Sequence, residues 1–201
     1  MLHASEAVTV PAPLPPSGAG RAVTRITDIW DKGKAAVIFN ETTVTDPKGA
    51  TLWTVKRSIF ARGEGGFGGE RGPSTSSETP ERAPDFEVAI PVLPQQALLY
   101  RLCGDRNPLH SDPAFATAAG FPRPILHGLC TYGITCRAVL QTYANYDPAK
   151  IKSHAVRFSS PVFPGETITV DMWQDGDVIS FEARVKERGV TVIRNGKCVL
   201  G

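Results

Sequence analysis

The sequence predicts an α+β protein in which an antiparallel sheet wraps around one long buried helix. The first observation is the stretch of residues 127–143, which contains small residues such as Gly133 and a single charged residue, Arg137. A helix that is apolar on nearly all sides is usually a buried one. The second observation is that alternating apolar and polar runs, separated by turn residues, fill residues 155–200. Helices followed by such a meander indicate the α+β class.

The N-terminal residues 1–61 are expected to form strands as well. A short β-like patch at 7–10 precedes a proline-rich stretch, and residues 21–61 are rich in β-branched and aromatic residues. Turn residues at 31–33 and 46–49 divide this part into three runs, which predicts three antiparallel strands. None of these runs has apolar residues at helical spacing, so we expect no buried helix here.

Residues 63–85 are expected to be a Gly/Ser/Pro-rich linker. Residues 63–68 match the G-x-G-x-x-G pattern of dinucleotide-binding turns. Such a turn must open a helix, whose N-terminus holds the pyrophosphate. Here Gly72, Pro73 and a run of Ser and Thr follow instead, so we expect no dinucleotide site. The Ser/Pro/Glu-rich part is expected to be mobile.

Beyond the linker, short helices precede the long one. Pro94 suits the first turn of a helix at 95–102, because its missing N–H costs nothing there. Asp112 followed by Pro113 indicates the N-cap and first residue of a second short helix, which should end near residue 119. Strands are expected at 86–93, 155–159, 167–173, 179–186 and 190–200, with a hairpin turn at Asp175-Gly176 and a bulge at Asn195-Gly196.

The composition of the 201-residue chain excludes several classes of function. The net charge is +2 and no Lys/Arg block interleaves with aromatic residues, so we expect no nucleic-acid partner. The longest apolar segment contains Arg137 and is too short to span a membrane. The four cysteines lack paired metal-ligand spacing and fit a reducing compartment. Because residues 1–10 do not resemble a signal peptide, we expect a cytoplasmic protein.

The residues that suggest chemistry lie in the stretch 100–118. Asp105 and His110 are five positions apart, and Asn107 and Pro108 lie between them, so the chain must turn. A turn that holds a carboxylate beside an imidazole suits general acid–base catalysis. The alternative is a capped loop, in which Asp105 and Asn107 bond nearby backbone groups and His110 is a partly buried ring.

Two other kinds of site fit the sequence poorly. A metal ion could draw on Asp105, His110, Asp112 and His127, but the sequence has no H-E-x-x-H, no paired cysteines and no ligand pair at i, i+4 spacing. A serine hydrolase would need a G-x-S-x-G turn, which does not occur. We therefore expect neither a metal site nor a nucleophilic serine.

The run from Tyr100 through Gly-Asp-x-Asn-Pro-Leu-His to Ala116 resembles the signature of the hydratase 2 family, the MaoC-like (R)-specific enoyl-CoA hydratases. The later segment Pro124-Ile125-Leu126-His127-Gly128 is similar to this family too. The resemblance implies a double hotdog fold. It divides the chain into an incomplete N-terminal hotdog half at 1–62, the linker at 63–85 and a C-terminal MaoC-like hotdog domain at 86–201 that carries the active site.

The resemblance also implies roles for single residues. Asp105 and His110 would be the catalytic pair, and which of them is the base stays open. Gly128 would supply a backbone N–H to the thioester carbonyl, at the start of a helix where such groups are free. Asn107 and His127 would contact the substrate. The alternatives are that Asn107 serves only the turn and that His127 is only the residue at the helix start.

The implied activity is the reversible hydration of trans-2-enoyl-CoA to (R)-3-hydroxyacyl-CoA in fatty acid metabolism. No metal or redox cofactor would be needed, because the CoA thioester is the substrate. One alternative is a (3R)-hydroxyacyl-thioester dehydratase of lipid synthesis, acting on CoA or acyl carrier protein. The other is a non-catalytic, acyl-CoA-binding hotdog subunit, because a fold does not guarantee a function.

Each half of a double hotdog is expected to have a sheet and a long helix, and residues 1–61 lack the helix. The chain therefore resembles a double hotdog that begins partway through its first half. Strands that carry Trp30, Phe39, Trp53 and Phe60 would then expose an apolar face. We expect the chain to form a homo-oligomer, most simply a dimer, or to bind a partner segment there, with weakened catalysis. The alternative is that loops of the same chain, including 63–85, cover the face.

Overall fold

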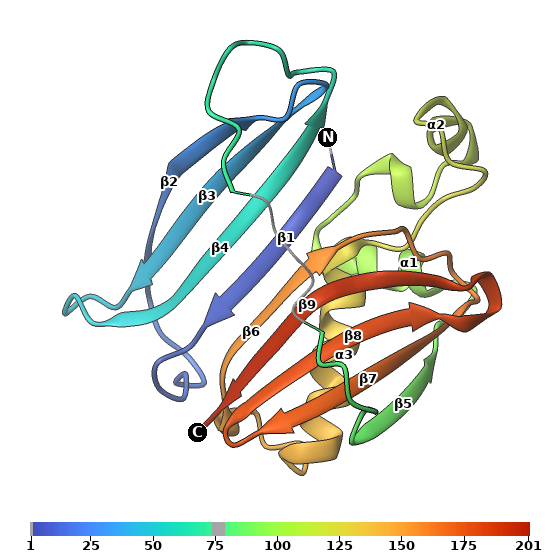
Figure 1. Cartoon of the computed structure of the whole chain (residues 1–201). Coiled ribbons are helices and arrows are strands. Elements are labelled where there is room, and N and C mark those ends of the chain that lie inside the picture. The colour runs from blue at the N-terminus through green and yellow to red at the C-terminus, as the bar shows by residue number, and fades with distance from the viewer. Residues whose placement is uncertain (1, 74–78) are drawn as a thin grey trace.

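The computed structural model describes residues 2–73 and 79–201, and within them it shows an antiparallel sheet of nine strands in the order β2-β3-β4-β1-β6-β9-β8-β7-β5 (Figure 1). The strands are β1 (Leu2–Thr9), β2 (Arg21–Asp31), β3 (Ala35–Thr45), β4 (Thr51–Arg62), β5 (Phe86–Pro91), β6 (Ile151–Phe158), β7 (Thr167–Asp175), β8 (Val178–Val185) and β9 (Val190–Leu200). The helices are α1 (Gln96–Tyr100), α2 (Pro113–Ala118) and α3 (Gly128–Tyr143), with 3-10 turns η1 (Arg101–Cys103), η2 (Pro108–His110), η3 (Pro148–Lys150) and η4 (Lys186–Arg188).

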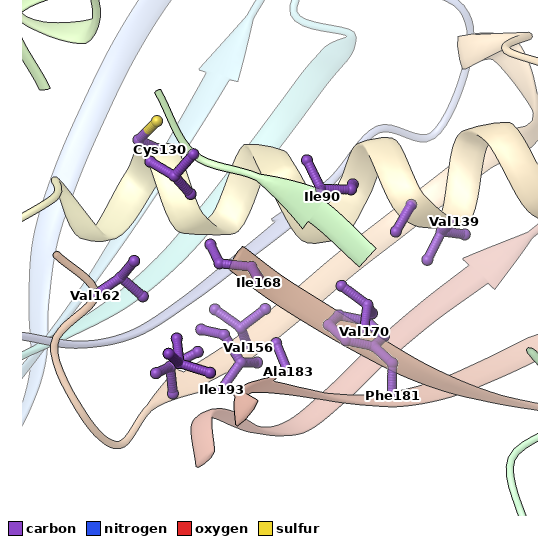
Figure 2. Close-up of a cluster of buried hydrophobic side chains, with 14 of the residues drawn as sticks. Ile90, Cys130, Val139, Val156, Val162, Ile168, Val170, Phe181, Ala183 and Ile193 are labelled. Carbon is purple, nitrogen blue, oxygen red and sulfur yellow. The ribbon is translucent and has the colours of Figure 1, made fainter. Parts of the chain in front are cut away.

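Helix α3 is the centre of the C-terminal part, as the sequence predicts. Its buried residues, among them Cys130 and Val139, pack against fully buried side chains of the sheet such as Ile168 and Phe181 (Figure 2). Burying one aliphatic or aromatic side chain contributes about 1.5–3 kcal/mol, so this cluster is the main source of stability. The α+β class and the buried helix are both confirmed.

Local chemistry sets the ends of most elements. Asp112 caps α2 by accepting hydrogen bonds from the backbone N–H groups of Ala114 and Phe115, and Pro113 is the first helical residue. The register between β8 and β9 shifts where Asn195 adopts φ +51°, which confirms the bulge. Several expected boundaries were wrong: β1 begins at Leu2, β5 ends at Pro91 instead of 93, β6 begins at Ile151, and the helix expected at 95–102 ends at Tyr100 and continues as η1.

The N-terminal part consists of β2, β3, β4 and β1, and residues 2–62 contain no helix. Strand β1 joins this part to the rest of the sheet, because it pairs with β4 on one side and with β6 on the other. The two parts of the chain therefore share one hydrogen-bonded sheet (Figure 1).

The described part of the linker folds back onto one face of this sheet. The Asp31 carboxylate accepts hydrogen bonds from the backbone N–H groups of Gly33, Gly66 and Gly68, and those from Gly66 and Gly33 lower its pKa most. Gly72 lies directly on the Trp30 ring, where a Cβ would be 2.1 Å from it. The G-x-G-x-x-G run therefore surrounds a carboxylate of its own chain, and loop residues cover Trp30. The expectation of mobility at 74–78 lies outside the described residues.

The opposite face of the N-terminal strands stays open toward the edge strand β2. Ile29, Ile38 and Ile59 are directly opposite one another on β2, β3 and β4, so they lie on one face. Ile29 is 48% exposed and Ile26 on the same strand is 63% exposed. The expectation that Trp30, Phe39 and Phe60 form the uncovered face is wrong: the linker lies on Trp30, and Phe39 and Phe60 line the groove described below, whereas the exposed residues are isoleucines.

In the part of the chain that the structure describes, no helix is long and apolar enough to cross a membrane.

Candidate active site

The turn at Asp105–His110 is built by short side chains that bond their own backbone. Gly104 ends η1 with φ +111°, a conformation that favours glycine. The Asp105 carboxylate accepts a hydrogen bond from the N–H of Asn107 at 3.2 Å, and the Asn107 side chain accepts one from the N–H of Leu109 at 3.1 Å. Leu109 is buried and anchors the turn. Asn107 therefore has the structural role that was one of its two interpretations, and its contact with substrate stays a prediction.

His110 presents one defined ring nitrogen to the site. Its Nδ1 lies 2.9 Å from the carbonyl oxygen of Ile125, and a carbonyl can only accept, so Nδ1 carries the proton. In the neutral ring, Nε2 is then left with a free lone pair. Burial lowers the pKa of His110 below its ordinary value of 6.5, against the raising effect of the bond to Ile125. His110 is therefore a neutral acceptor near pH 7.

His127 lies behind His110. It is 1% exposed, its ring stacks on that of His110 with centroids 3.8 Å apart, and its Nε2–H donates to the backbone carbonyl of Asp105 at 3.2 Å. Burial, followed by the neighbouring charge of His110, lowers its pKa. These contacts favour the interpretation of His127 as a residue of the helix start that supports the turn, rather than a polar wall of the pocket.

Asp105, His110 and His127 each place one potential metal-ligand atom within 4.8 Å of the others. Among the described residues, this cluster therefore has side chains of the kinds that bind metal ions. Each imidazole, however, already bonds a backbone carbonyl through one nitrogen, and the two rings are stacked at 28° rather than pointed at a common centre. That no metal is used stays a prediction.

Gly128 is the first residue of α3, a helix of 16 residues, and His127 is its N-cap. The first N–H groups of a helix have no partner within it and form its positive end. A Cβ at Gly128 would lie 3.5 Å from the Phe158 ring and 3.8 Å from the Cβ of His3. Because Gly128 also lines the groove described below, a bound molecule can reach its backbone.

These groups share one groove of about 1210 Å³, which Asp105, Asn107, His110 and Gly128 line together. The wall from the C-terminal part includes Leu109, Phe121, Ile125, Leu126, Leu129, Phe158 and Val162. The wall from the N-terminal part includes Leu2, His3, Glu6, Trp30, Val37, Phe39, Arg57 and Phe60. The sequence analysis missed the N-terminal residues His3, Glu6 and Arg57, because no local pattern marks them.

A carboxylate, a neutral imidazole and the N-terminal N–H groups of α3 meet in one groove with apolar walls, and this combination is the one expected of a hotdog-fold enzyme that acts on acyl thioesters. Two family models agree with this class. The model described as MaoC like domain matches residues 75–196, and the model described as MFE-2 hydratase 2 N-terminal domain matches residues 1–63. The chain belongs to the MaoC-like hydratase 2 family.

Individual relatives are consistent with the family. The chain is 64% identical over 196 residues to "Enoyl-CoA hydratase ChsH3" of Mycobacterium tuberculosis, covering 98% of this chain and 68% of that protein. The structure of full-length peroxisomal multifunctional enzyme type 2 from Drosophila melanogaster aligns at a TM-score of 0.91 with 39% identity, over 100% of this chain and 37% of that one. A Mycobacterium tuberculosis protein described as a double hotdog fold aligns over 99% of this chain and 75% of its own length at a TM-score of 0.60 with 10% identity, which shows the fold alone.

Proposed function

We propose that the protein reversibly hydrates trans-2-enoyl-CoA thioesters to (R)-3-hydroxyacyl-CoA in fatty acid metabolism. The observation that carries this proposal is the free Nε2 lone pair of His110 beside the Asp105 carboxylate and the open N-terminus of α3 at Gly128. Relatives that are named enoyl-CoA hydratases support it.

The geometry supports a division of labour between the two catalytic residues. A water molecule between them would donate one hydrogen bond to the Asp105 carboxylate and one to Nε2 of His110. As the water oxygen bonds to C3 of the substrate, its proton passes to Nε2, and the imidazolium then protonates C2. The product has gained one water and His110 is neutral again. His110 is therefore the proton carrier and Asp105 orients the water.

The thioester oxygen gains negative charge when C3 is attacked. With its carbonyl at Gly128, that oxygen would accept a hydrogen bond from the backbone N–H and face the positive end of α3. One preorganised donor of this kind is worth about 10²–10³ in turnover. The same groups serve the reverse dehydration, and both CoA and acyl carrier protein present the same thioester. We propose CoA as the carrier and the cytoplasm as the compartment. Some relatives are named as peroxisomal enzymes.

The proposal is tested with crotonyl-CoA and a longer trans-2-enoyl-CoA, by following the loss of the conjugated thioester absorbance. Asp105→Ala and His110→Ala should each reduce turnover by about 10²–10⁴, the usual contribution of a positioned acid or base. Both should remain folded, because Asp105 is exposed and the His110 ring makes one hydrogen bond to the described residues, to the Ile125 carbonyl. Asp147→Asn is the matched control, since Asp147 caps the remote turn η3.

Near-normal turnover in either alanine variant would remove that residue from the mechanism. Tight binding of the acyl-CoA without any hydration by the wild-type protein would instead favour a non-catalytic subunit.

A further inference from the structure

Strand β1 brings the N-terminal part of the chain to the active site. Leu2 packs against the buried cluster that contains Leu109 and Ile125. Leu109 precedes His110 in the chain, and the carbonyl oxygen of Ile125 accepts the hydrogen bond from Nδ1 of His110. The register of β1 against β4 shifts between His3 and Ser5. His3, before the shift, is opposite Ile59, and Glu6, after it, is opposite Arg57. Because Ile59 and Arg57 are two residues apart on β4, His3 and Glu6 lie on one face although they are three residues apart.

His3 is the outermost member of a polar group on that face. Glu6 is 4% exposed, and its carboxylate accepts hydrogen bonds from Nε of Arg57 at 3.3 Å and from Nη2 at 3.2 Å. The same carboxylate accepts a bond from Nε2–H of His3 at 2.8 Å. A neutral imidazole that donates through Nε2 keeps a lone pair on Nδ1. In its neutral form His3 therefore offers Nδ1 as an acceptor while Glu6 holds its Nε2–H.

This imidazole lies beside the proposed thioester position. The Cβ of His3 is 3.8 Å from the point where a Cβ of Gly128 would lie, and the His3 ring centroid is 5.0 Å from that of Phe158. The side chain is 23% exposed and lines the same groove as Asp105 and His110. A molecule bound in front of Gly128 therefore passes directly by His3.

We propose that Nδ1 of His3 accepts a hydrogen bond from the first amide N–H of the pantetheine arm of the substrate. This inference rests on the proposed function, which places the thioester carbonyl at Gly128. The amide nitrogen is joined to the thioester sulfur by two methylene groups, so it follows the thioester past Gly128. An amide N–H that leaves water for a groove with apolar walls needs an acceptor. The Glu6–Arg57 ion pair positions that acceptor.

The test is a double-mutant cycle between enzyme and substrate. Crotonyl-N-acetylcysteamine contains the amide, and the crotonyl S-propyl thioester lacks it. His3→Leu should lower kcat/KM for the amide-bearing thioester about threefold to tenfold more than for the S-propyl thioester, the size expected for one neutral hydrogen bond. His3→Asn should restore most of the difference, because its side chain can present an oxygen near the position of Nδ1.

A purely structural role for His3 would slow both thioesters equally, and that result would overturn the inference. Asp171→Asn is the matched control: Asp171 is also a buried carboxylate paired with an arginine, Arg184, but it lies outside the groove. It should leave both rates unchanged. The same double-mutant cycle can be carried out with dissociation constants of the saturated butyryl thioesters, and this measurement needs no turnover. Failure of hydration by the wild-type protein would therefore overturn the proposed function, while the binding cycle would still decide the role of His3.

Discussion

Three of the four histidines of this chain, His110, His127 and His154, have pKa values that burial lowers. His110 and His127 are stacked, and burial lowers the pKa of both. His154 is completely enclosed, and burial lowers its pKa to about 3. Near neutral pH these three rings are therefore uncharged. Only the direction of their hydrogen bonds decides which nitrogen can accept a proton.

The protonation of His110 predicts the acid limb of the pH profile. If Nε2 of His110 must accept a proton from water, then protonation of His110 abolishes the activity. Because burial lowers its pKa from the ordinary value of 6.5, kcat/KM should stay high at pH 6.5 and fall only at lower pH. The profile of crotonyl-CoA hydration from pH 4.5 to pH 8 checks this. A limb centred above pH 6.5 would show that another group is the base.

The open backbone at Gly128 predicts a specific effect of side chains there. Gly128→Val should lower turnover by about 10²–10³, because a branched side chain would keep the thioester oxygen away from the N–H. The fold should survive, since the nearest atoms to the added Cβ are at ordinary contact distances of 3.5 Å and beyond. Gly133→Val in the same helix is the control, because a Cβ there meets nothing within 4 Å. Equal turnover in both variants would place the oxyanion donor elsewhere.

At the residue scale, sequence alone predicts the parts of the site that are local. Asp105, Asn107 and His110 occupy one turn, and their backbone bonds follow from residue type and spacing. The stacking of His127 on His110 depends on how the loop between them folds. The position of His3 depends on the pairing of β1 with β4 and on a register shift, which no short pattern specifies.

At the scale of elements, α3 and β6 are joined by a buried polar contact as well as by apolar packing. Nε2 of His154 lies 3.1 Å from the hydroxyl of Thr135, and the His154 ring stacks on Phe181 at 10°. The Tyr132 hydroxyl donates to the backbone carbonyl of His154 at 2.8 Å. This contact gives the hydroxyl of Thr135, one of the two buried threonines of α3, a polar partner inside the core.

The burial of His154 predicts how stability depends on pH. In the unfolded chain His154 titrates near 6.5, whereas in the folded protein its pKa is about 3. Between these values the unfolded state binds the proton and the folded state does not, so acid favours unfolding. Between pH 7.5 and pH 5 this group alone should remove about 2 kcal/mol from the free energy of unfolding.

Urea denaturation at the two pH values measures this difference. In His154→Leu the loss of stability from pH 7.5 to pH 5 should be smaller than in the wild-type protein by that amount, whatever the variant's stability at pH 7.5. The same loss in both proteins would mean that other groups govern the acid sensitivity.

Sequence predicted these elements best where capping or turn residues mark them. The start of α2 at Asp112-Pro113 and the turn after β7 at Asp175-Gly176 are examples. The start of β6 was placed too late, because Ile151 to His154 contains three polar residues and extends the strand only by pairing with β9 and β1. Pairing with distant partners is not visible in a local pattern.

At the scale of the whole molecule, the open isoleucine face predicts self-association. Ile26→Lys with Ile29→Lys should weaken any oligomer, because like charges would then meet across a contact between copies. Sedimentation velocity over a wide range of concentrations measures the effect. Leu14→Lys is the control, since Leu14 is also exposed but lies outside the sheet. A wild-type protein that is strictly monomeric at every concentration would contradict the prediction.

The position of β1 between β4 and β6 also governs the order in which the molecule can form. Strands β2, β3 and β4 pair with neighbours in sequence and can associate as soon as they are synthesised. Strand β1, in contrast, has one edge that stays unpaired until the distant strand β6 has been synthesised. Pairings between distant segments form slowly, because closing a long loop costs entropy. The groove therefore forms only after β6 has been synthesised, and until then the nascent chain exposes an unpaired strand edge.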